Sequence, residues 1–166
     1  MYLEELNPDN PQEYRTPDGW SEFETRGSII KVKDEAPITL TLRWTENGPV
    51  IPASVKSLGT ITPRGHVTAL RWTVLSPNDT SLTAAFGIMQ AETVQDAIAA
   101  MEDYIAPAQN LTLADRDTIA MKTVGVIPSR DANHLTQGRL PSFGYMPQNR
   151  WQGRMPYASN LSLIHI

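Results

Sequence analysis

A strict alternation of apolar and polar residues over residues 38–44 constrains the fold of this chain more than any other feature. The apolar members are Ile38, Leu40, Leu42 and Trp44, and the polar members are Thr39, Thr41 and Arg43. Successive side chains of a strand point to opposite faces, so this period of two predicts a half-buried β-strand. Residues 20–33 have extended character and residues 34–37 form a connection, so the two segments are predicted to pair as an antiparallel hairpin.

Shorter strands and turns are predicted on both sides of this hairpin. Residues 7–19 are rich in Pro, Asn, Asp and Gly, and we predict turns throughout them. The chain turns again at residues 47–49. Further strands are predicted at residues 50–51, 66–75, 111–114 and 118–127. Between the last two, Asp115 and Asp117 are predicted to stabilise a tight turn rather than to act as a general acid and base. Beyond Pro128 we predict mostly loop.

Two helices are predicted between the strands, near residues 80–105. The first has Asp79, Thr80 or Ser81 as its candidate cap. Its apolar stripe is Leu82, Ala85, Phe86 and Met89. The second begins at Thr93 with Asp96 three residues later, the spacing of a capping box, and Pro107 ends it. Its stripe is Val94, Ala97, Ile98, Met101 and Ile105. Both stripes have helical spacing, and we interpret both as core packing rather than cofactor contact.

Composition argues against several classes of partner. The formal net charge is −4, whereas binding to nucleic acid needs a surplus of Lys and Arg. Cys is absent, which excludes a thiolate metal site and a Cys nucleophile within these residues. No stretch approaches the ~20 apolar residues of a membrane span, and the acidic first residues do not form a signal peptide. We therefore expect neither nucleic acid nor a membrane as the partner.

The common catalytic motifs are missing from these residues. The sequence contains no G-x-S-x-G, H-E-x-x-H, phosphate-binding P-loop or G-x-G-x-x-G pattern. The three histidines, His66, His134 and His165, do not have the spacing of metal ligands, so surface or loop positions are the better interpretation. Local chemistry alone therefore predicts a mixed α/β segment without an assignable active site.

The order of several motifs along the chain is more informative than any one of them. From the N-terminus they are Tyr2-Leu-Glu-Glu-Leu-Asn-Pro, Asp18-Gly-Trp, Thr41-Leu-Arg-Trp-Thr-Glu-Asn-Gly-Pro-Val-Ile, Ala69-Leu-Arg-Trp-Thr, Ala106-Pro-Ala-Gln-Asn, Gly125-Val-Ile-Pro-Ser-Arg, Arg139-Leu-Pro and Trp151-Gln-Gly-Arg-Met-Pro-Tyr. In this order they resemble a continuous part of the β-subunit of penicillin acylase-type N-terminal-nucleophile hydrolases, a family that includes acyl-homoserine lactone acylases. The resemblance covers roughly residues 2–157.

The resemblance implies an α+β fold, namely an incomplete piece of a four-layer αββα sandwich that is β-rich with two helices near residues 80–105. It also implies a fragment of an amidohydrolase that cleaves linear amide bonds of N-acylated small molecules. In such enzymes a Ser, Cys or Thr at the new N-terminus of the β-subunit attacks the amide carbonyl. The resemblance places that nucleophile, and the Asn that binds the oxyanion, outside this chain. We therefore assign no catalytic residue here and expect the isolated segment to be inactive.

The resemblance also implies a boundary and a set of partners. Residues 1–160 are interpreted as a partial β-subunit segment, and residues 161–166 as a non-native tail because they do not continue the family pattern. The expected partners are an N-acylated substrate and the rest of the same precursor, meaning its α-subunit and the remaining β-subunit. The implied location is periplasmic or secreted. Without the rest of the precursor, we expect unpaired strand edges and exposed apolar faces to make the chain unstable or prone to aggregate.

Three residues receive binding roles from the resemblance. Phe86 falls where the family places a bulky aromatic residue of the acyl pocket, although a core position is equally well supported by its apolar stripe. Gln109 falls at a position that approaches the acyl group, and it is polar where penicillin G acylases are apolar, which argues against phenylacetyl specificity. Gly138 falls near a backbone carbonyl that binds a structural Ca²⁺ in many members. No cofactor for catalysis is implied.

Two alternative hypotheses remain at this point. Instead of being part of an active amidohydrolase, the chain could belong to a non-catalytic β-rich binding module. The other alternative is an inactive acylase homologue that serves as a binding scaffold. One departure bears on specificity, because Asn47 stands where the family commonly has His. This difference indicates a divergent member, so the substrate of a relative does not transfer directly.

Overall fold

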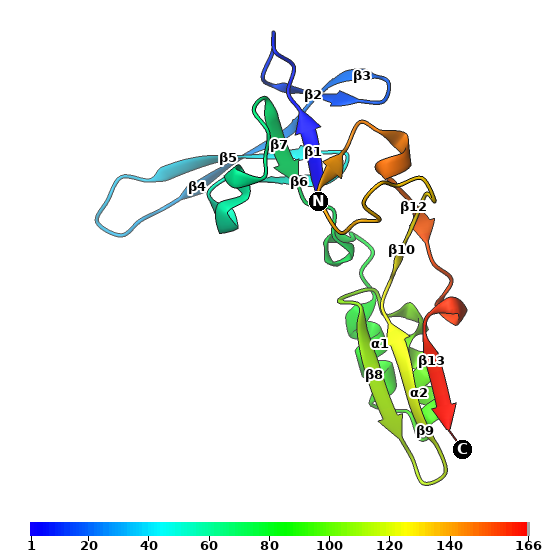
Figure 1. Ribbon diagram of the computed structural model, residues 1–166. Helices are drawn as coiled ribbons and strands as arrows, with labels where there is room; N and C mark the ends of the chain where they lie inside the picture. The colour runs from blue at the N-terminus through cyan, green and yellow to red at the C-terminus, as the bar shows by residue number, and fades with distance from the viewer. Residues whose placement is uncertain (166) are drawn as a thin grey trace. The chain divides into compact units, whose positions relative to one another are not determined.

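The computed structural model describes residues 1–165, without the side chains of Ile164 and His165, and divides into two compact units (Figure 1). Unit 1 comprises Met1–Arg71 and Arg130–Arg150. Unit 2 comprises Trp72–Ser129 and Trp151–Ile166. Each unit is therefore assembled from two stretches of chain that are distant in sequence, and each has its own β-sheet.

Unit 1 is built on a six-stranded sheet with the strand order β11-β1-β7-β6-β5-β4. Its strands are β1 (Tyr2–Glu5), β4 (Glu24–Ile30), β5 (Ile38–Thr45), β6 (Gly48–Ile51), β7 (His66–Ala69) and β11 (Ser142–Phe143). Neighbouring strands are antiparallel except β1 and β11, which are parallel. A 3₁₀-helix, Val55–Thr60, lies between β6 and β7. The predicted strand over residues 66–75 is thus shorter, because β7 ends at Ala69 and a 3₁₀ turn follows at Thr73–Leu75.

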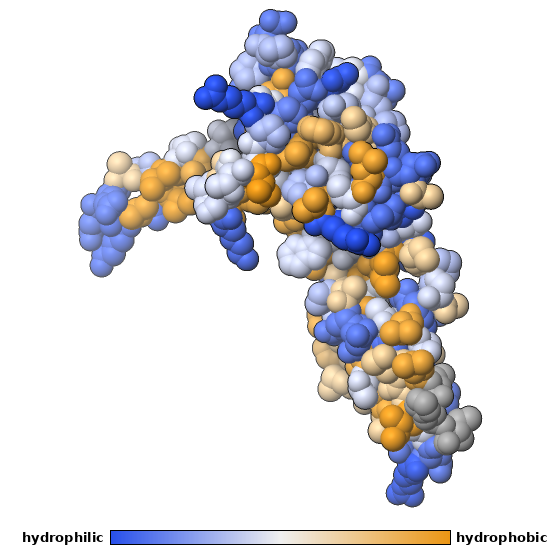
Figure 2. Space-filling view, viewed as in Figure 1, coloured by the Kyte–Doolittle hydropathy of each residue, from blue (hydrophilic) through white to orange (hydrophobic). Residues whose placement is uncertain are grey.

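The predicted hairpin is confirmed as β4 and β5, which pair from Glu24 with Trp44 to Ile30 with Ile38. Its predicted half-burial is wrong within this chain. Ile38, Leu40 and Leu42 expose 50%, 43% and 41% of their surface, and Thr45 at the end of β5 is the first buried residue. Figure 2 shows apolar side chains gathered along this projecting hairpin. The period of two therefore gives the correct strand, but most of its apolar face has no cover among the described residues.

Residues 13–22 correct the prediction of continuous turns. β2 (Glu13–Thr16) and β3 (Gly19–Glu22) form a two-stranded antiparallel hairpin whose turn is at residues 17–18. Tyr14 explains why a strand forms here, since its buried ring lies 5.0 Å from the ring of Phe23. Its hydroxyl accepts a hydrogen bond of 2.9 Å from the backbone N–H of Glu46. This tertiary contact overrides the local preference for turns.

Unit 2 places two helices on one face of a three-stranded sheet (Figure 1). The helices are α1 (Ser81–Ile88) and α2 (Val94–Ala100), and a 3₁₀ turn, Met101–Asp103, follows α2. The sheet has the order β13-β9-β8, formed by β8 (Gln109–Ala114), β9 (Ile119–Val124) and β13 (Ser162–His165). Two short strands, β10 (Pro128–Arg130) and β12 (Trp151–Arg154), pair separately. A short 3₁₀ turn at Tyr157–Ser159 follows β12, and another, Pro147–Asn149, belongs to unit 1.

The second helix forms as its sequence predicts. Thr93 and Asp96 make a reciprocal capping box, in which each side chain accepts a hydrogen bond from the other residue's backbone N–H. Val94, Ala97 and Met101 are buried, which confirms the core role of this stripe. The regular helix ends at Ala100 and the 3₁₀ turn replaces its last predicted turn, so the helix stops before Pro107.

The first helix forms where predicted, but its predicted core stripe is wrong. Leu82, Phe86 and Met89 expose 71%, 60% and 77% of their surface. The buried side of α1 instead carries Ala84, which packs with Met101 and Val124. Small residues at this contact let α1 lie close to α2, since a Cβ on Gly87 would lie 3.3 Å from the Cβ of Ala100. Leu82 and Phe86 of α1, and Met89 directly after it, are consequently turned outward, whereas Ile88 packs partly buried against the core.

The turn between β8 and β9 has the predicted origin. The Asp115 carboxylate accepts hydrogen bonds from the backbone N–H groups of Asp117 (2.9 Å) and Thr118 (2.7 Å). Its second oxygen accepts a hydrogen bond of 2.9 Å from the N–H of Val94, at the start of α2. These bonds, that of Val94 first, hold the pKa of Asp115 below its usual value. The Asp115 carboxylate therefore joins the β8–β9 turn to the start of α2, and these contacts indicate a structural role rather than an acid–base role.

The chain exposes more surface than a globular protein of its mass. Its accessible area is 11239 Å². A folded monomer of 18.4 kDa exposes about 8,200 Å². Two separate globular bodies of half this mass would together expose about 9,900 Å². Division into two units therefore does not account for the difference, and exposed apolar side chains on β4, β5 and α1 are part of it.

We expect residues 1–165 alone to unfold in a broad transition of low cooperativity and to bind the dye ANS, because large apolar side chains remain exposed. Circular dichroism during heating, combined with a dye titration, measures both properties. A sharp and reversible thermal transition without dye binding would contradict this expectation.

Candidate functional site

The structure places the two predicted acyl-contacting residues in unit 2 and the predicted metal-contacting residue in unit 1. Phe86 lies on the outward face of α1 between Leu82 and Met89, and all three side chains are exposed. Gln109 is the first residue of β8 and pairs with Val124 of β9. Paired residues share a face of a sheet, so Gln109 projects from the face that packs against the helices, and it is exposed. Both residues are therefore accessible from outside unit 2.

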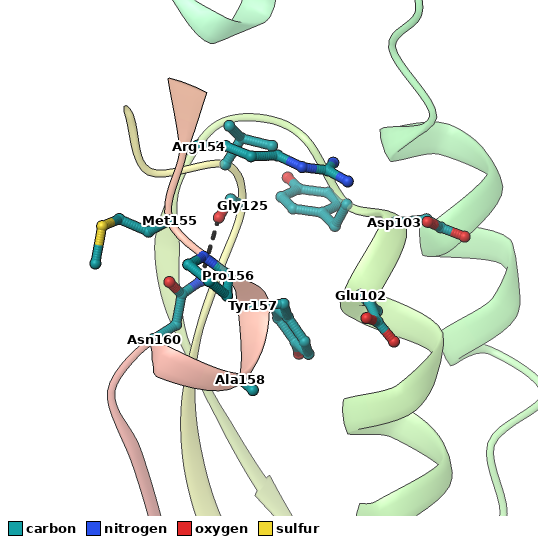
Figure 3. A pocket seen from close by; sticks show the side chains of 11 residues that line it. Glu102, Asp103, Gly125, Arg154, Met155, Pro156, Tyr157, Ala158 and Asn160 are labelled. Carbon is teal, nitrogen blue, oxygen red and sulfur yellow. Dashed lines mark hydrogen bonds between the residues drawn. The ribbon is translucent and has the colours of Figure 1, made fainter. Parts of the chain in front are cut away.

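A pocket of about 290 Å³ lies elsewhere on unit 2 (Figure 3). Its lining comes from the 3₁₀ turn after α2 and the next residue, the residues after β9, and the last residue of β12 with the segment that follows it: Glu102, Asp103, Tyr104, Gly125, Val126, Arg154, Met155, Pro156, Tyr157, Ala158 and Asn160. Neither Phe86 nor Gln109 is among these residues. The lining contains no Ser, Thr, Cys or His, so a hydroxyl or thiol of these residues activated by a histidine base cannot form from it.

A buried lysine, to which no sequence motif assigns a role, holds one wall of this pocket in place. Lys122 of β9 is 4% exposed, and its Nζ donates hydrogen bonds to the backbone carbonyls of Tyr157 (3.0 Å) and Asn160 (3.1 Å). The same ammonium lies 4.5 Å from the centre of the Tyr157 ring. Because a buried charge needs such partners, Lys122 joins the segment after β12 to the sheet. The only available signal was the position of Lys122 on the same face as Ala120 and Val124.

Further hydrogen bonds orient the same segment. The hydroxyl of Tyr157 donates to the backbone carbonyl of Ile98 on α2 at 2.9 Å. The amide of Asn160, which is buried, donates to the carbonyls of Thr123 (3.2 Å) and Gly125 (3.4 Å), the latter drawn in Figure 3. Gly125 has φ +95°, and a Cβ there would lie 2.6 Å from the Cα of Ala108. A glycine is therefore required at this bend.

The pocket carries charges of both signs. Figure 3 shows the Arg154 side chain on one wall and Glu102 and Asp103 across from it. Burial, and secondarily the charge of Glu102, raises the pKa of the Tyr157 phenol above its usual range. Tyr157 therefore stays neutral at ordinary pH and acts as a hydrogen-bond donor. The arrangement suits polar binding and structural support, and it does not form a recognisable catalytic centre.

Unit 1 contains a fully buried carboxyl group. Glu4 of β1 is 0% exposed. Its Oε1 accepts hydrogen bonds from the Nδ2 of Asn47 (2.9 Å) and the Oγ1 of Thr45 (3.1 Å), while its Oε2 has no hydrogen-bond partner. Burial raises the pKa of this carboxyl above its usual value, against the opposing effects of the two hydrogen bonds and the Arg150 charge. Glu4 thus joins β1 to the turn between β5 and β6.

A second segment closes over this carboxyl group. A Cβ on Gly144 would lie 2.1 Å from the Oε2 of Glu4, so no larger residue fits there without movement. Arg150 donates from its Nε to the carbonyl of Gly144 at 3.3 Å and forms an ion pair with Glu46. The segment that follows β11 is therefore held against β1 at Gly144, whose N–H donates to the carbonyl of Leu3 at 3.0 Å, and to the β5–β6 turn by the ion pair of Arg150 with Glu46.

Asn47, which stands where the resembling family commonly has His, lies within this cluster around Glu4. Asn47 is 1% exposed, donates to Glu4, and accepts a hydrogen bond of 3.2 Å from Arg71 Nη1. The family resemblance indicates that Asn is unusual at position 47, but only the structure shows that its amide connects the Glu4 carboxyl group to the Arg71 guanidinium. An Asn cannot become charged, so a change of its hydrogen bond to Glu4 with pH comes from the carboxyl group and not from Asn47.

The surroundings of Gly138 do not by themselves form a calcium site. Gly138 has φ +80°, and a Cβ there would lie 2.6 Å from the Nε of Arg130. The positively charged guanidinium of Arg130 therefore lies close to Gly138, and its charge repels a divalent cation there. Among the side chains that the structure describes, no group of three or more His, Cys, Asp or Glu is placed to hold a metal ion. Gly138 as one carbonyl ligand, with the other ligands supplied from elsewhere, stays a prediction.

The family of the chain follows from comparison with known proteins. Residues 1–165 match the family model of penicillin amidase, and the chain belongs to that family. Among curated proteins it is similar to the acyl-homoserine lactone acylases QuiP of Pseudomonas fluorescens, with 29% identity over 154 residues, and of Pseudomonas aeruginosa, with 26% identity over 159 residues. The family inferred from the order of motifs is therefore confirmed.

The fold agrees with this assignment. A thermostable penicillin G acylase from Alcaligenes faecalis superposes with a TM-score of 0.84 at 20% sequence identity, covering 99% of this chain and 28% of that one. The β-rich structure with two helices is thus a portion of the penicillin acylase fold. The chain spans 18% of the length of the two curated relatives. The predicted non-native tail at residues 161–166 is untested by these matches and stays a prediction.

Substitutions at Glu4 should distinguish its two roles as hydrogen-bond acceptor and buried acid. We expect Glu4→Ala to destabilise unit 1 by about 1–3 kcal/mol, because Asn47 and Thr45 lose their acceptor. Glu4→Gln keeps an acceptor oxygen and should be much less disruptive. Hydrogen exchange of the β1 and β6 amides at fixed pH measures the difference, and equal exchange in both variants would contradict the assigned role.

The same carboxyl group should make unit 1 less stable as the pH rises. Its pKa in the folded state is raised above the usual 4.5, so its stabilising effect is complete below that value and is lost as the pH rises through the raised pKa. Urea unfolding from pH 4 to pH 8 should show this loss in the wild type and not in Glu4→Gln. An unchanged slope in the variant would assign the effect to another group.

Proposed function

We propose that this chain is a segment of an amidohydrolase that cleaves the linear amide bond of N-acylated small molecules, as acyl-homoserine lactone and penicillin acylases do. The observation that carries the proposal is the match to the penicillin amidase family over residues 1–165, together with the acylase fold. The relatives with 26–29% identity named above are acyl-homoserine lactone acylases by name. An acyl-homoserine lactone is therefore the first substrate class to test.

The reaction proceeds through a nucleophile outside these residues. A Ser, Cys or Thr at a new N-terminus attacks the amide carbonyl, and its own α-amine, with a pKa near ~8, accepts the proton. Residue 1 is Met, whose thioether cannot take this role. The amine product leaves, and water then releases the acid from the acyl-enzyme. Backbone N–H groups and an Asn beyond this segment stabilise the oxyanion.

The contribution of this chain is recognition of the acyl group. Phe86, Leu82 and Met89 form an outward apolar surface on α1, which suits contact with an acyl chain. Gln109 places an amide on the helix-facing side of the sheet, so the acyl site combines apolar and polar contacts. A polar group at this position disfavours a purely aromatic acyl group such as phenylacetyl. We assign both residues to substrate binding and neither to catalysis.

The rest of the precursor, meaning an α-subunit and the remaining β-subunit, completes this site. The proposed location is periplasmic or secreted, as the family resemblance implies. No helix among residues 1–165 is long and apolar enough to cross a membrane. The proposal involves neither nucleic acid nor a membrane as a partner, and no cofactor takes part in catalysis.

The test uses the complete reading frame that contains this segment, purified and supplied with N-acyl homoserine lactones of increasing chain length and with a phenylacetyl amide. Release of the free amine is measured for each substrate. Phe86→Ala should lower kcat/KM for the preferred acyl group by about tenfold or more, because an apolar contact is lost. Gln109→Leu should shift the preference toward more apolar acyl groups.

The control is Leu135→Ala, since Leu135 is 86% exposed in unit 1 and has no assigned role. Unchanged acyl preference in both site variants, with active enzyme, would remove Phe86 and Gln109 from the acyl site. Failure of the complete protein to release any amine, with substrate still bound, would favour the inactive homologue instead.

A further inference from the structure

The hairpin of β4 and β5 has one apolar face and one mainly polar face. Pairing places Ile30 opposite Ile38, Ser28 opposite Leu40, and Arg26 opposite Leu42, and each pair projects from the same face. The other face carries Thr39 and Thr41 with Gly27 and Thr25, and Ile29 is its large apolar member. The hairpin thus has the amphipathic pattern of a strand pair that covers an apolar surface.

This apolar face is open along most of the hairpin. Ile30, Ile38, Leu40 and Leu42 expose between 41% and 50% of their surface. The hairpin tip is different, because Lys31, Lys33, Asp34 and Glu35 there are charged or polar and suit water. Figure 2 shows this division, with hydrophilic residues at the tip and hydrophobic residues behind it.

An isolated two-stranded hairpin is marginally stable, so the outer part of this one needs a partner to stay ordered. β4 is also an edge strand, with one side of its backbone unpaired among the described residues. The accessible area of 11239 Å² exceeds that of two globular bodies of half the mass by about 1,300 Å². One partner in a stable interface typically buries about 800 Å². The chain therefore has area enough for a substantial interface.

We propose that the apolar face of the β4–β5 hairpin, formed by Ile30, Ile38, Leu40 and Leu42, docks onto an apolar surface of the remaining acylase polypeptide. The occupant follows from length, because this chain spans 18% of its curated relatives and 28% of the solved acylase. The inference rests on the proposed membership of a longer acylase and adds the surface through which the segment joins it. The charged tip extends beyond the docked region and stays in water.

The test compares hydrogen exchange of residues 24–45 in the chain alone and in the complete acylase, measured by mass spectrometry. Docking should slow exchange of these amides by at least tenfold in the complete protein. Leu40→Asp and Leu42→Asp should abolish that protection in the complete protein and leave the isolated chain unchanged. Thr39→Asp and Thr41→Asp are matched controls on the opposite face of the same strand and should retain it.

Three outcomes would overturn the proposal. The first is equally fast exchange of the hairpin in both proteins. The second is equal loss of protection in the Thr and Leu variants, which would show that the apolar face is not the contact. The third is protection in the isolated chain that rises with concentration alongside dimers in sedimentation, which would assign the face to a second copy. Amine release is measured separately, so an inactive but protected protein would refute the proposed function and leave the docking surface standing.

Discussion

The hydrogen bonds of two buried ionisable side chains, Glu4 and Lys122, are the interactions on which the two units depend. In unit 1, the carboxyl of Glu4 is fully buried against Asn47 and Thr45, and it ties the first strand to the β5–β6 turn. In unit 2, the ammonium of Lys122 is buried against two backbone carbonyls of the segment after β12. Burial of a polar group is unfavourable unless its hydrogen bonds are satisfied, so each group determines how distant segments meet. Each unit is assembled from discontinuous chain around such a contact.

Whereas these ionisable groups are buried, many large apolar side chains of both units stay exposed. The hairpin face at Leu40 and Leu42, and the outward face of α1 at Phe86, both remain accessible. Because the acylase relatives named above are several times longer, we propose a separate role for each face. The proposed partner of the first is another part of the polypeptide, and that of the second is an acyl chain. The pocket beside Tyr157 fits neither, since it lacks the groups that amide cleavage requires.

Sequence reasoning succeeded where structure is set by local contacts. The β4–β5 hairpin, the capping box of Thr93 and Asp96, and the turn at Asp115 were all predictable, because pairing, caps and turns depend on neighbouring residues. It failed where a distant residue decides. Tyr14 forms a strand because its ring meets Phe23 and its hydroxyl meets Glu46, and no local pattern announces that contact. For the candidate site, the order of motifs identified the family, while the positions of Phe86 and Gln109 relative to a substrate stay predictions.

The sequence by itself determined the family, both helices and the main strands apart from β2 and β3, and the absence of the common catalytic motifs, because these follow from residue order and short-range periodicity. Tertiary structure alone decided which side of each element is covered. Helical spacing assigned Leu82, Phe86 and Met89 to a core, yet α1 buries Ala84 because small residues allow the helices to approach closely. It also decided that Asn47 bridges Glu4 and Arg71. Periodicity describes the faces of one element, whereas burial depends on which other elements lie against them.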